Sequence, residues 1–366
     1  MSRKLAVLGT GLIGGSVALA ARALGDRVAG YDRDPATLER AVELGALDEA
    51  AASAGAAVAG AEVVVVCLPV DAIAPCCAEI APALGPDAVV TDVGSAKAAV
   101  VAAAEAVLEE RFVGGHPMAG SERHGIEAAD ARLFEDAWWI LTPTAATASH
   151  AYARVSELVA SLGARPVAVD PAVHDELVAH LSHVPQLTAS ALVDAAVRAG
   201  SAAGTEALLG LAGPGFRDVT RIAASHAELW VAILRANREA VLGALDGLRA
   251  RLRTLAGLIE QDRWDDLRAF LERARQARLG LFAKPDYGGE PVGLALLVPD
   301  RPGVLAEVTT AAGELGANIE DLRIVHSTEG GQGRLELVVA GDEAAALLTG
   351  ALAALGYRVE RIELET

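Results

Sequence analysis

The chain has 366 residues, enough for two or three domains with separate hydrophobic cores. Its formal net charge of -18 argues against nucleic acid or an acidic membrane surface as a partner, because both require a basic face. Three clustered cysteines, Cys67, Cys76 and Cys77, fit neither a disulfide framework nor a zinc site, so we expect a protein of a reducing compartment such as the cytoplasm.

The chain opens with a strand, a glycine-rich turn, a helix and a second strand. Residues 4–8 are predicted to form a short buried strand, 16–24 a helix, and 27–31 a strand that ends on Asp32. Between the first strand and the helix, residues 9–14 spell GxGxxG. This pattern, with an acidic residue at the tip of the next strand, is typical of a dinucleotide-binding fold.

Each glycine of this motif has a physical reason to be there. Gly9 permits the tight turn, Gly11 lets a pyrophosphate approach the backbone, and Gly14 allows the helix to pack closely on the strand. Leu12 and Ile13 complete the motif, where the N-terminus of the helix offers its positive dipole to the phosphates. The alternative is a structural turn that binds no nucleotide.

The acid after the second strand predicts the cofactor. Asp32 is expected to accept hydrogen bonds from the adenosine ribose hydroxyls and to repel a 2'-phosphate, which favours NAD over NADP. Arg33 leaves NADP open, because it could contact a phosphate if the acid turned away.

The uncharged stretch from residue 5 to residue 21 also follows Arg3 and Lys4, as in a secretory signal. Its glycines, the lack of a clean cleavage site and the strand-helix rhythm that follows oppose that interpretation. We therefore expect these residues to belong to the folded domain.

Two further apolar runs continue the predicted parallel sheet, at residues 61–68 and 88–92. In open sheets of this class, ligands bind beyond the carboxyl ends of the strands. We therefore expect Pro69, Asp92 and Ser95 to lie near the nicotinamide end of the cofactor.

Residues 114–122 read GGHPMAGSE and are predicted to form an active-site loop. Glycines let the backbone approach a ligand, Pro117 biases His116 away from helix, and an imidazole can exchange a proton near neutral pH. The alternative is a tight turn that carries an incidental histidine.

A helix is predicted over residues 173–184, with His180 and His183 on one face and Pro185 ending or bending it. The HxxH spacing also suggests a metal, but no third ligand with suitable spacing follows, so we expect none.

The segment 213–223 reads GPGFRDVTRIA and supplies a candidate anchor for a carboxylate. Arg221 is favoured because a guanidinium offers two parallel donors, and Asp218 lies on the same predicted helical face and is expected to orient it. Arg217 is a competing anchor, and an exposed surface pair is the alternative.

Residues 171–278 are otherwise predicted to be helical, with more apolar surface than one small bundle can bury, which indicates a dimer interface. Residues 284–291 read as a linker. Beyond them the predicted order is strand, helix, strand, strand, helix, strand, the ferredoxin-like plan.

The DVGSAK, GGHPMAGSE, HLSH and FRDVTR segments, together with the dinucleotide fold, resemble the prephenate dehydrogenase family over residues 4–285. That family includes arogenate and cyclohexadienyl dehydrogenases. The resemblance implies a Rossmann-type α/β domain, an all-helical domain that forms an intertwined homodimer, and NAD-dependent oxidative decarboxylation of prephenate. In the tail, DRPGVLAEV and LGANIEDL resemble an ACT domain.

The resemblance also implies roles for individual residues. His116 would contact the ring hydroxyl of prephenate as the catalytic base, and Ser95 would hydrogen-bond His116 or the same hydroxyl. His183 would contact the substrate side chain, and His180 would belong to a gating network or be structural. Glu122 would shape the pocket or the gate, and Trp230 would reach the partner subunit's site or lie in the core.

In the ACT-like tail the implied effector site comprises Gly303, Leu305, Asn318 and Ile319, with tyrosine or phenylalanine as ligand. A module that serves only for dimerisation is the alternative.

We therefore predict three domains, at residues 1–170, 171–285 and 290–366. Only three residues precede the first strand, so we expect no chorismate mutase domain before it. The alternative functions are an arogenate dehydrogenase, a dual-specificity cyclohexadienyl dehydrogenase, a 2-hydroxyacid dehydrogenase and a non-catalytic sensor of NAD and amino acids.

Overall fold

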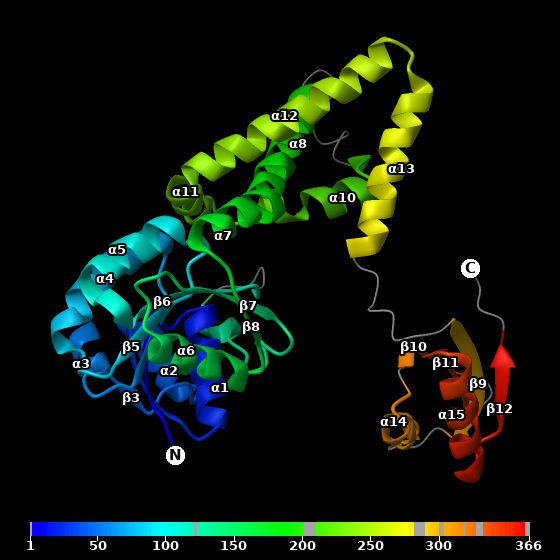
Figure 1. Cartoon of the computed structure of the whole chain (residues 1–366), viewed down its shortest axis with the longest axis horizontal. Helices are drawn as coiled ribbons and strands as arrows, with labels where there is room; N and C mark the ends of the chain where they lie inside the picture. Colours follow the sequence, from blue (N-terminus) through cyan, green and yellow to red (C-terminus); the bar gives the residue numbers. More distant parts are fainter. Residues whose placement is uncertain are drawn as a thin grey trace. The chain divides into compact units, whose positions relative to one another are not determined.

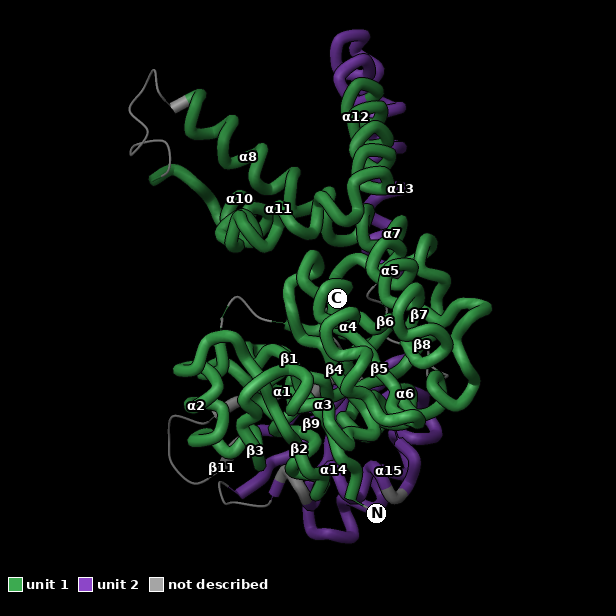
Figure 2. The backbone as a smooth tube through the Cα atoms, turned by 90° about the vertical axis from the view of Figure 1, so that its left-hand side faces the viewer, with its two compact units in different colours: residues 1–254 green, residues 255–366 purple. Residues whose placement is uncertain are grey.

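The computed structural model describes residues 2–120, 123, 125–200, 210–281, 290–299, 304–317, 319–326 and 332–362. The chain divides into two compact units, residues 1–254 and 255–366, shown in different colours in Figure 2. The first unit extends across the predicted boundary at residue 170.

The first unit is built on an eight-stranded sheet in the order β3-β2-β1-β4-β5-β6-β7-β8. Neighbouring strands run parallel except β6 and β7, which are antiparallel. The strands are β1 (Lys4–Leu8), β2 (Arg27–Tyr31), β3 (Glu49–Ala50), β4 (Val63–Val66), β5 (Val89–Asp92), β6 (Phe112–Pro117), β7 (Trp138–Thr142) and β8 (Arg165–Ala168).

Helices cover both faces of this sheet, as Figure 1 shows. Leu5 and Val7 of β1 join one buried cluster with α1 and α6, while Ala6 and Leu8 join the opposite cluster with α3, α4 and α5. Burial on both faces explains the continuous apolar runs of the sequence. The helices are α1 (Leu12–Ala23), α2 (Pro35–Glu43), α3 (Ala54–Val58), α4 (Val70–Ile80), α5 (Ala98–Leu108) and α6 (Ser149–Ser161), with 3-10 turns at Ala81–Ala83, Glu109–Arg111 and Ile126–Ala128.

A helical segment follows the sheet. It comprises α7 (Pro171–Val178), a π-helical turn (Ala179–His183), α8 (Val184–Gly200), α10 (Pro214–Thr220), a 3-10 turn (Arg221–Ala224), α11 (Ala227–Ala236), α12 (Arg238–Glu260) and α13 (Trp264–Leu281). Ala232 and Ala236 of α11 pack against the cluster that contains α4, which joins this segment to the sheet.

Pro185 does not end the helix, so of the two predicted outcomes, an end or a bend, the end is wrong. It lies in the first turn of α8, directly after the π-helical turn. Proline has no N–H to donate and its ring crowds the preceding turn, so the widened turn accommodates it while the helix continues.

The second unit contains the predicted ferredoxin-like fold. Its four-stranded antiparallel sheet has the order β10-β11-β9-β12, and Leu294, Leu296, Val308 and Leu348 lie in its core. The elements are β9 (Pro291–Pro299), α14 (Val304–Glu314), β10 (Ile319–His326), β11 (Gln332–Ala340), α15 (Asp342–Ala354) and β12 (Val359–Ile362).

The fold class is therefore confirmed in all three of its parts. Of the predicted effector residues, Gly303 and Asn318 lie outside the described residues, as does the side chain of Leu305. Ile319 begins β10 and packs partly buried against the core. Among the described residues, no helix is both long and apolar enough to cross a membrane.

The turn between β1 and α1 is closely packed at two of its three motif glycines. Gly9 has φ +92°, and a Cβ atom on Gly14 would lie 1.9 Å from the carbonyl oxygen of Gly9. A Cβ atom on Gly11 would meet nothing within 4 Å.

We predict that Gly14→Ala lowers the free energy of unfolding by about 2 kcal/mol or more, because backbone must move to admit the methyl group. The matched variant Gly11→Ala should unfold like the wild type while weakening dinucleotide binding. Chemical denaturation of both variants checks this. Equal stability of the two variants would contradict the observed packing.

Candidate active site

The carboxyl ends of the parallel strands gather the predicted cofactor and catalytic residues at one edge of the sheet. Gly9 follows β1, Asp32 follows β2, Pro69 follows β4, and Ser95 follows β5. His116 lies near the end of β6. This is the edge at which ligands bind in open α/β sheets.

The glycine-rich turn fits a dinucleotide. Gly11 is the N-cap residue of α1 and makes no side-chain capping bond, so the first amides of the helix are open to an anion. The open space in front of Gly11 leaves room for a pyrophosphate against the backbone. Leu12 and Ile13 begin the helix and are half-buried.

Asp32 is held before any cofactor arrives. Its carboxylate accepts hydrogen bonds from the backbone and the hydroxyl of Thr10 and from the backbone of Asp34. Arg33 is exposed to solvent. The carboxylate therefore stays at the place where adenosine ribose hydroxyls are expected.

Asp92 ends β5 at this edge of the sheet, and its contacts lie within the protein. Its side chain is fully buried and forms an ion pair with the buried Lys97, while its oxygens also accept from the backbone amides of Gly94 (2.8 Å) and Gly115 (3.0 Å). Lys97 Nζ donates in addition to the carbonyl of Gly115 at 2.9 Å. These contacts hold the carboxylate and the lysine against Gly115, the residue before His116.

His116 belongs to a chain of three side chains that the sequence analysis did not find. Its Nδ1 lies 2.9 Å from Nε2 of His174, and Nδ1 of His174 lies 2.8 Å from Oδ1 of Asp175. The carboxylate of Asp175 also accepts from the backbone amides of Lys97 (2.7 Å) and Ala98 (2.9 Å), at the N-terminus of α5. His174 is fully buried.

The hydrogen bonds between His116, His174 and Asp175 set the tautomer of His116. A carboxylate only accepts, so Nδ1 of His174 donates to Asp175, and Nε2 of a neutral His174 accepts. His116 must then donate from Nδ1, which leaves the lone pair on its Nε2. His116 is thus arranged as an acceptor of one proton.

Electrostatics keep this base neutral. Burial foremost holds the pKa of His116 well below its usual range, and the charge of the nearby Lys97 adds to the shift. Burial opposes ionisation of Asp175, but hydrogen bonds from His174 and from the two amides outweigh it and lower the pKa of that carboxyl. Burial also lowers the pKa of Lys97, although Asp92 opposes the shift.

His183 lies in a second buried group. Nδ2 of Asn237 donates to Nδ1 of His183 (3.2 Å) and to the carbonyl of Asp175 (2.8 Å). The ring of Trp230 packs edge-on against His183, with centroids 5.9 Å apart. Trp230 therefore contacts a predicted site residue of its own chain.

His180 and His183 do not share a face, contrary to the prediction. His180 is exposed while His183 is 1% exposed, because the π-helical turn spaces the residues differently from an α-helix. His180 lines an apolar cavity of about 660 Å³ together with residues of α8, α10 and α12, including Val184, Val219 and Leu248.

The predicted carboxylate anchor lies apart from these contacts. α10 ends at Thr220, and Arg221 begins a 3-10 turn that follows it directly. Both are exposed, as is Arg217, and the described residues include no ion pair between Asp218 and Arg221.

For two other predicted site residues, Ser95 and Glu122, the described part of the structure shows no contact with the site. Ser95 is half-buried, but the recorded partner of His116 in the described part of the chain is His174, with no bond from the Ser95 hydroxyl. Glu122 lies outside the described residues.

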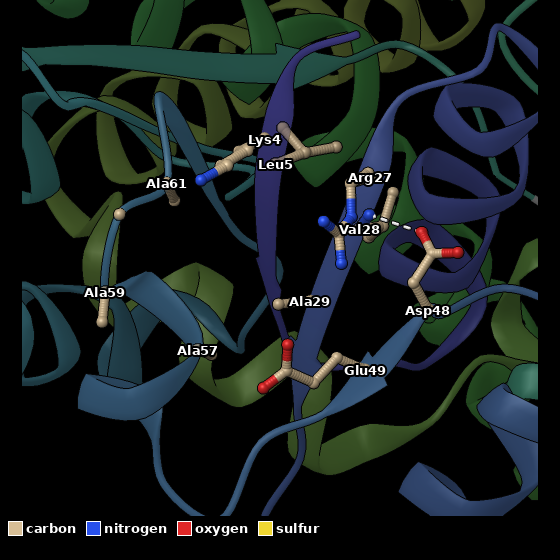
Figure 3. A pocket seen from close by; sticks show the side chains of 11 residues that line it. Lys4, Leu5, Arg27, Val28, Ala29, Asp48, Glu49, Ala57, Ala59 and Ala61 are labelled. Atoms are coloured by element: carbon tan, nitrogen blue, oxygen red, sulfur yellow. Dashed lines mark hydrogen bonds between the residues drawn. The ribbon is translucent and has the colours of Figure 1, made fainter.

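The opposite edge of the sheet carries a smaller cavity of about 150 Å³, shown in Figure 3. Lys4 and Arg27 line it at the amino ends of β1 and β2, together with Asp48 and Glu49. It lies far along the strands from the glycine-rich turn, so we do not assign the cofactor to it.

The described residues contain no group of three or more side chains able to hold a metal. Burial raises the pKa of all three cysteine thiols, to about 11 for Cys76 and about 12 for Cys77, which suits core residues and not nucleophiles.

Models of known families match three successive parts of the chain. Residues 17–168 match the nucleotide-binding domain of prephenate dehydrogenase, residues 170–273 match its dimerization domain, and residues 294–357 match an ACT domain like that of the AHAS small subunit.

Similar proteins agree with these matches. A prephenate dehydrogenase of Bacillus subtilis is 34% identical over 354 residues, which cover 94% of each chain. The structure of A. aeolicus prephenate dehydrogenase with hydroxyphenyl propionate and NAD+ is 32% identical, with a TM-score of 0.73, over 77% of this chain and 99% of that one. Synechocystis arogenate dehydrogenase is 34% identical, with a TM-score of 0.68, over 75% and 98%.

We predict that the free energy of unfolding falls as the pH falls from about 6.5, the pKa of an unfolded histidine, towards about 4. Burial foremost lowers the pKa of His183 to about 4, so across this interval the unfolded chain binds the proton that the folded chain refuses. His183→Asn should reduce the fall, as followed by urea denaturation at each pH.

The exposed His150 on α6 offers the control variant His150→Asn. If that variant flattened the pH profile as much as His183→Asn did, the buried environment of His183 would not explain the effect.

Proposed function

The chain belongs to the prephenate dehydrogenase family, and we propose that it catalyses the NAD-dependent oxidative decarboxylation of prephenate to 4-hydroxyphenylpyruvate, in the synthesis of tyrosine. The observation that carries the proposal is the His116–His174–Asp175 chain at the same sheet edge as the glycine-rich turn. It supplies one proton acceptor where the chemistry needs one.

Removal of the hydroxyl proton is the step of this reaction that needs a base. The hydroxyl-bearing ring carbon loses hydride and its hydroxyl loses a proton, which forms a carbonyl. The bond between the ring and its carboxylate then breaks, and its electron pair enters the ring as carbon dioxide leaves. The ring becomes aromatic, so this step is strongly downhill.

We assign His116 as the residue that takes the hydroxyl proton at Nε2. His174 orients it through Nδ1, and Asp175 stabilises the positive charge that appears when the proton is taken. Lys97 and Asp92 are positioning residues, because they fix the backbone of Gly115 beside the base. Ser95 remains a candidate for a contact to the same hydroxyl.

NAD, when bound, would supply the hydride acceptor. The residues Gly9, Gly11, Leu12, Ile13 and Gly14 would hold its pyrophosphate at the N-terminus of α1, and Asp32 would hold its ribose. We keep Pro69 as a contact near the nicotinamide end.

Prephenate carries two carboxylates, which need cationic or amide partners. We keep Arg221 as the proposed anchor of one of them, with Asp218 beside it, and His183 as the contact of the substrate side chain. Arg221 is exposed in the single chain, and Trp230 and His180 border the same helical segment. A site completed in a dimer, with Glu122 at its entrance, agrees with this exposure.

A homodimer is supported by the surface of the helical segment. Within its described part, large apolar side chains are exposed at Val173, Leu177, Leu181, Leu192, Leu211, Val219, Val231, Leu242 and Leu252. An interface with a second copy would bury such side chains. We further propose that the ACT-like unit binds tyrosine or phenylalanine, through Gly303, Leu305, Asn318 and Ile319.

Arogenate, which has an amino group where prephenate has a ketone, is the second candidate substrate. Gln186, three residues after His183, is buried, and its Oε1 has no hydrogen-bond partner among the described residues. A buried acceptor without a donor is costly, and an ammonium group would satisfy it. Prephenate is preferred because the relative that matches 94% of this chain, including the ACT-like part, is a prephenate dehydrogenase.

We predict that the protein reduces NAD with prephenate faster than with arogenate, and that tyrosine inhibits the reaction. The formation of NADH with each substrate, with and without tyrosine, checks both statements. Faster oxidation of arogenate would reassign the substrate. Binding of NAD and tyrosine without turnover of either substrate would make the protein a sensor.

We predict that His116→Asn lowers kcat by at least about a thousandfold, because no other described side chain is arranged to take the proton. NAD binding should remain within about twofold of the wild type, since the variant leaves the β1–α1 turn intact. Stopped-flow NADH formation and NAD titration measure the two effects. Full turnover by the variant would refute the assignment of the base.

A further inference from the structure

We propose that the hydroxyl of Thr10 is a specificity-determining group for the cofactor, which locks Asp32 in the orientation that accepts NAD and rejects NADP. The proposal rests on the NAD dependence inferred above. It assigns a role to the residue between the first two glycines of the turn, a position that the GxGxxG pattern leaves free.

Thr10 is completely buried, and both of its polar donors point to one oxygen. Its backbone N–H donates to Oδ2 of Asp32 at 2.7 Å, and its hydroxyl donates to the same oxygen at 3.2 Å. The backbone N–H of Asp34 donates to the other oxygen, Oδ1, at 3.0 Å. The carboxylate is thus held from both sides.

The support behind Asp34 is equally defined. Asp34 is the N-cap residue of α2, where its carboxylate accepts from the amides of Ala36 and Thr37 and from the Thr37 hydroxyl at 2.6 Å. The amide of Asp34 is therefore fixed by the start of the helix. Asp32 is clamped between the β1–α1 turn and the N-terminus of α2.

This clamp has a consequence for the choice of cofactor. A mobile carboxylate could rotate away from a 2'-phosphate and let the exposed Arg33 pair with it. A carboxylate held by Thr10 keeps its charge at the ribose site, where it accepts from two hydroxyls but repels a phosphate. Selectivity then comes from the rigidity of Asp32 as much as from its charge.

Any residue other than proline at position 10 would keep the backbone bond, but only threonine or serine supplies the hydroxyl. Valine has nearly the same shape as threonine, so Thr10→Val removes the hydroxyl while leaving the buried volume filled. Thr10→Ser restores the hydroxyl without the methyl group. The two variants separate hydrogen bonding from packing.

Thr144 provides a matched control. Its hydroxyl donates to the carboxylate of Glu105 at 2.5 Å, so Thr144→Val also removes a bond from a threonine to a carboxylate, in a part of the first unit that carries none of the proposed cofactor residues. The experiment measures equilibrium binding of NAD and of NADP to the full-length protein by calorimetry, without substrate.

We expect Thr10→Val to reduce the preference for NAD over NADP by about tenfold, the effect of losing one hydrogen bond to a charged group. Thr10→Ser should stay within about twofold of the wild type, and Thr144→Val should match it. An unchanged preference in Thr10→Val, or an equal loss of affinity for both cofactors, would overturn the proposal. A wild-type protein that binds no NAD would overturn the proposed function as well.

Discussion

The buried ion pair between Lys97 and Asp92 is the interaction on which the arrangement of the active site depends. Two charges removed from water are costly unless each is paired and its remaining hydrogen-bonding capacity is used. Here the amides of Gly94 and Gly115 donate to Asp92, and the carbonyl of Gly115 accepts from Lys97, so both charged groups have further hydrogen-bond partners. The pair thereby joins two strands at the point where β6 leaves its parallel neighbour, one residue before the base.

The same lysine connects the sheet to the helical segment. The backbone amides of Lys97 and Ala98 donate to the carboxylate of Asp175. A side chain of α7 therefore caps the N-terminus of α5. Asn237 then ties the carbonyl of Asp175 to His183. Base, orienting histidine and proposed substrate contact are thus linked through residues that also hold the first unit together.

Sequence patterns predicted the secondary-structure elements. They did not predict the side-chain contacts between segments that are distant in the sequence. The strands β1 and β2, the glycine turn and the ferredoxin-like tail were correct because periodicity and turn residues are local signals. His174 and Asp175 looked like ordinary residues of a helix, since only folding brings them to His116, 58 residues away from His174. The sequence did contain one signal for this site. A histidine and an aspartate are adjacent in the first turns of the helix that follows the sheet. Asp92 was misjudged for a related reason, because a sequence does not show whether an acid at a strand end faces solvent or a buried lysine.

The π-helical turn at Ala179–His183 has a consequence for how such a helix varies in evolution. A π turn is equivalent to one residue inserted into an α-helix, and it rotates every later side chain about the axis by roughly 100°. In this chain it buries His183 and turns His180 outward. Loss of one residue before His180, such as Ala179, would restore a regular helix in which the two histidines, three residues apart, lie on one side. The number of residues before His180 in this segment therefore helps to determine which histidine faces the interior.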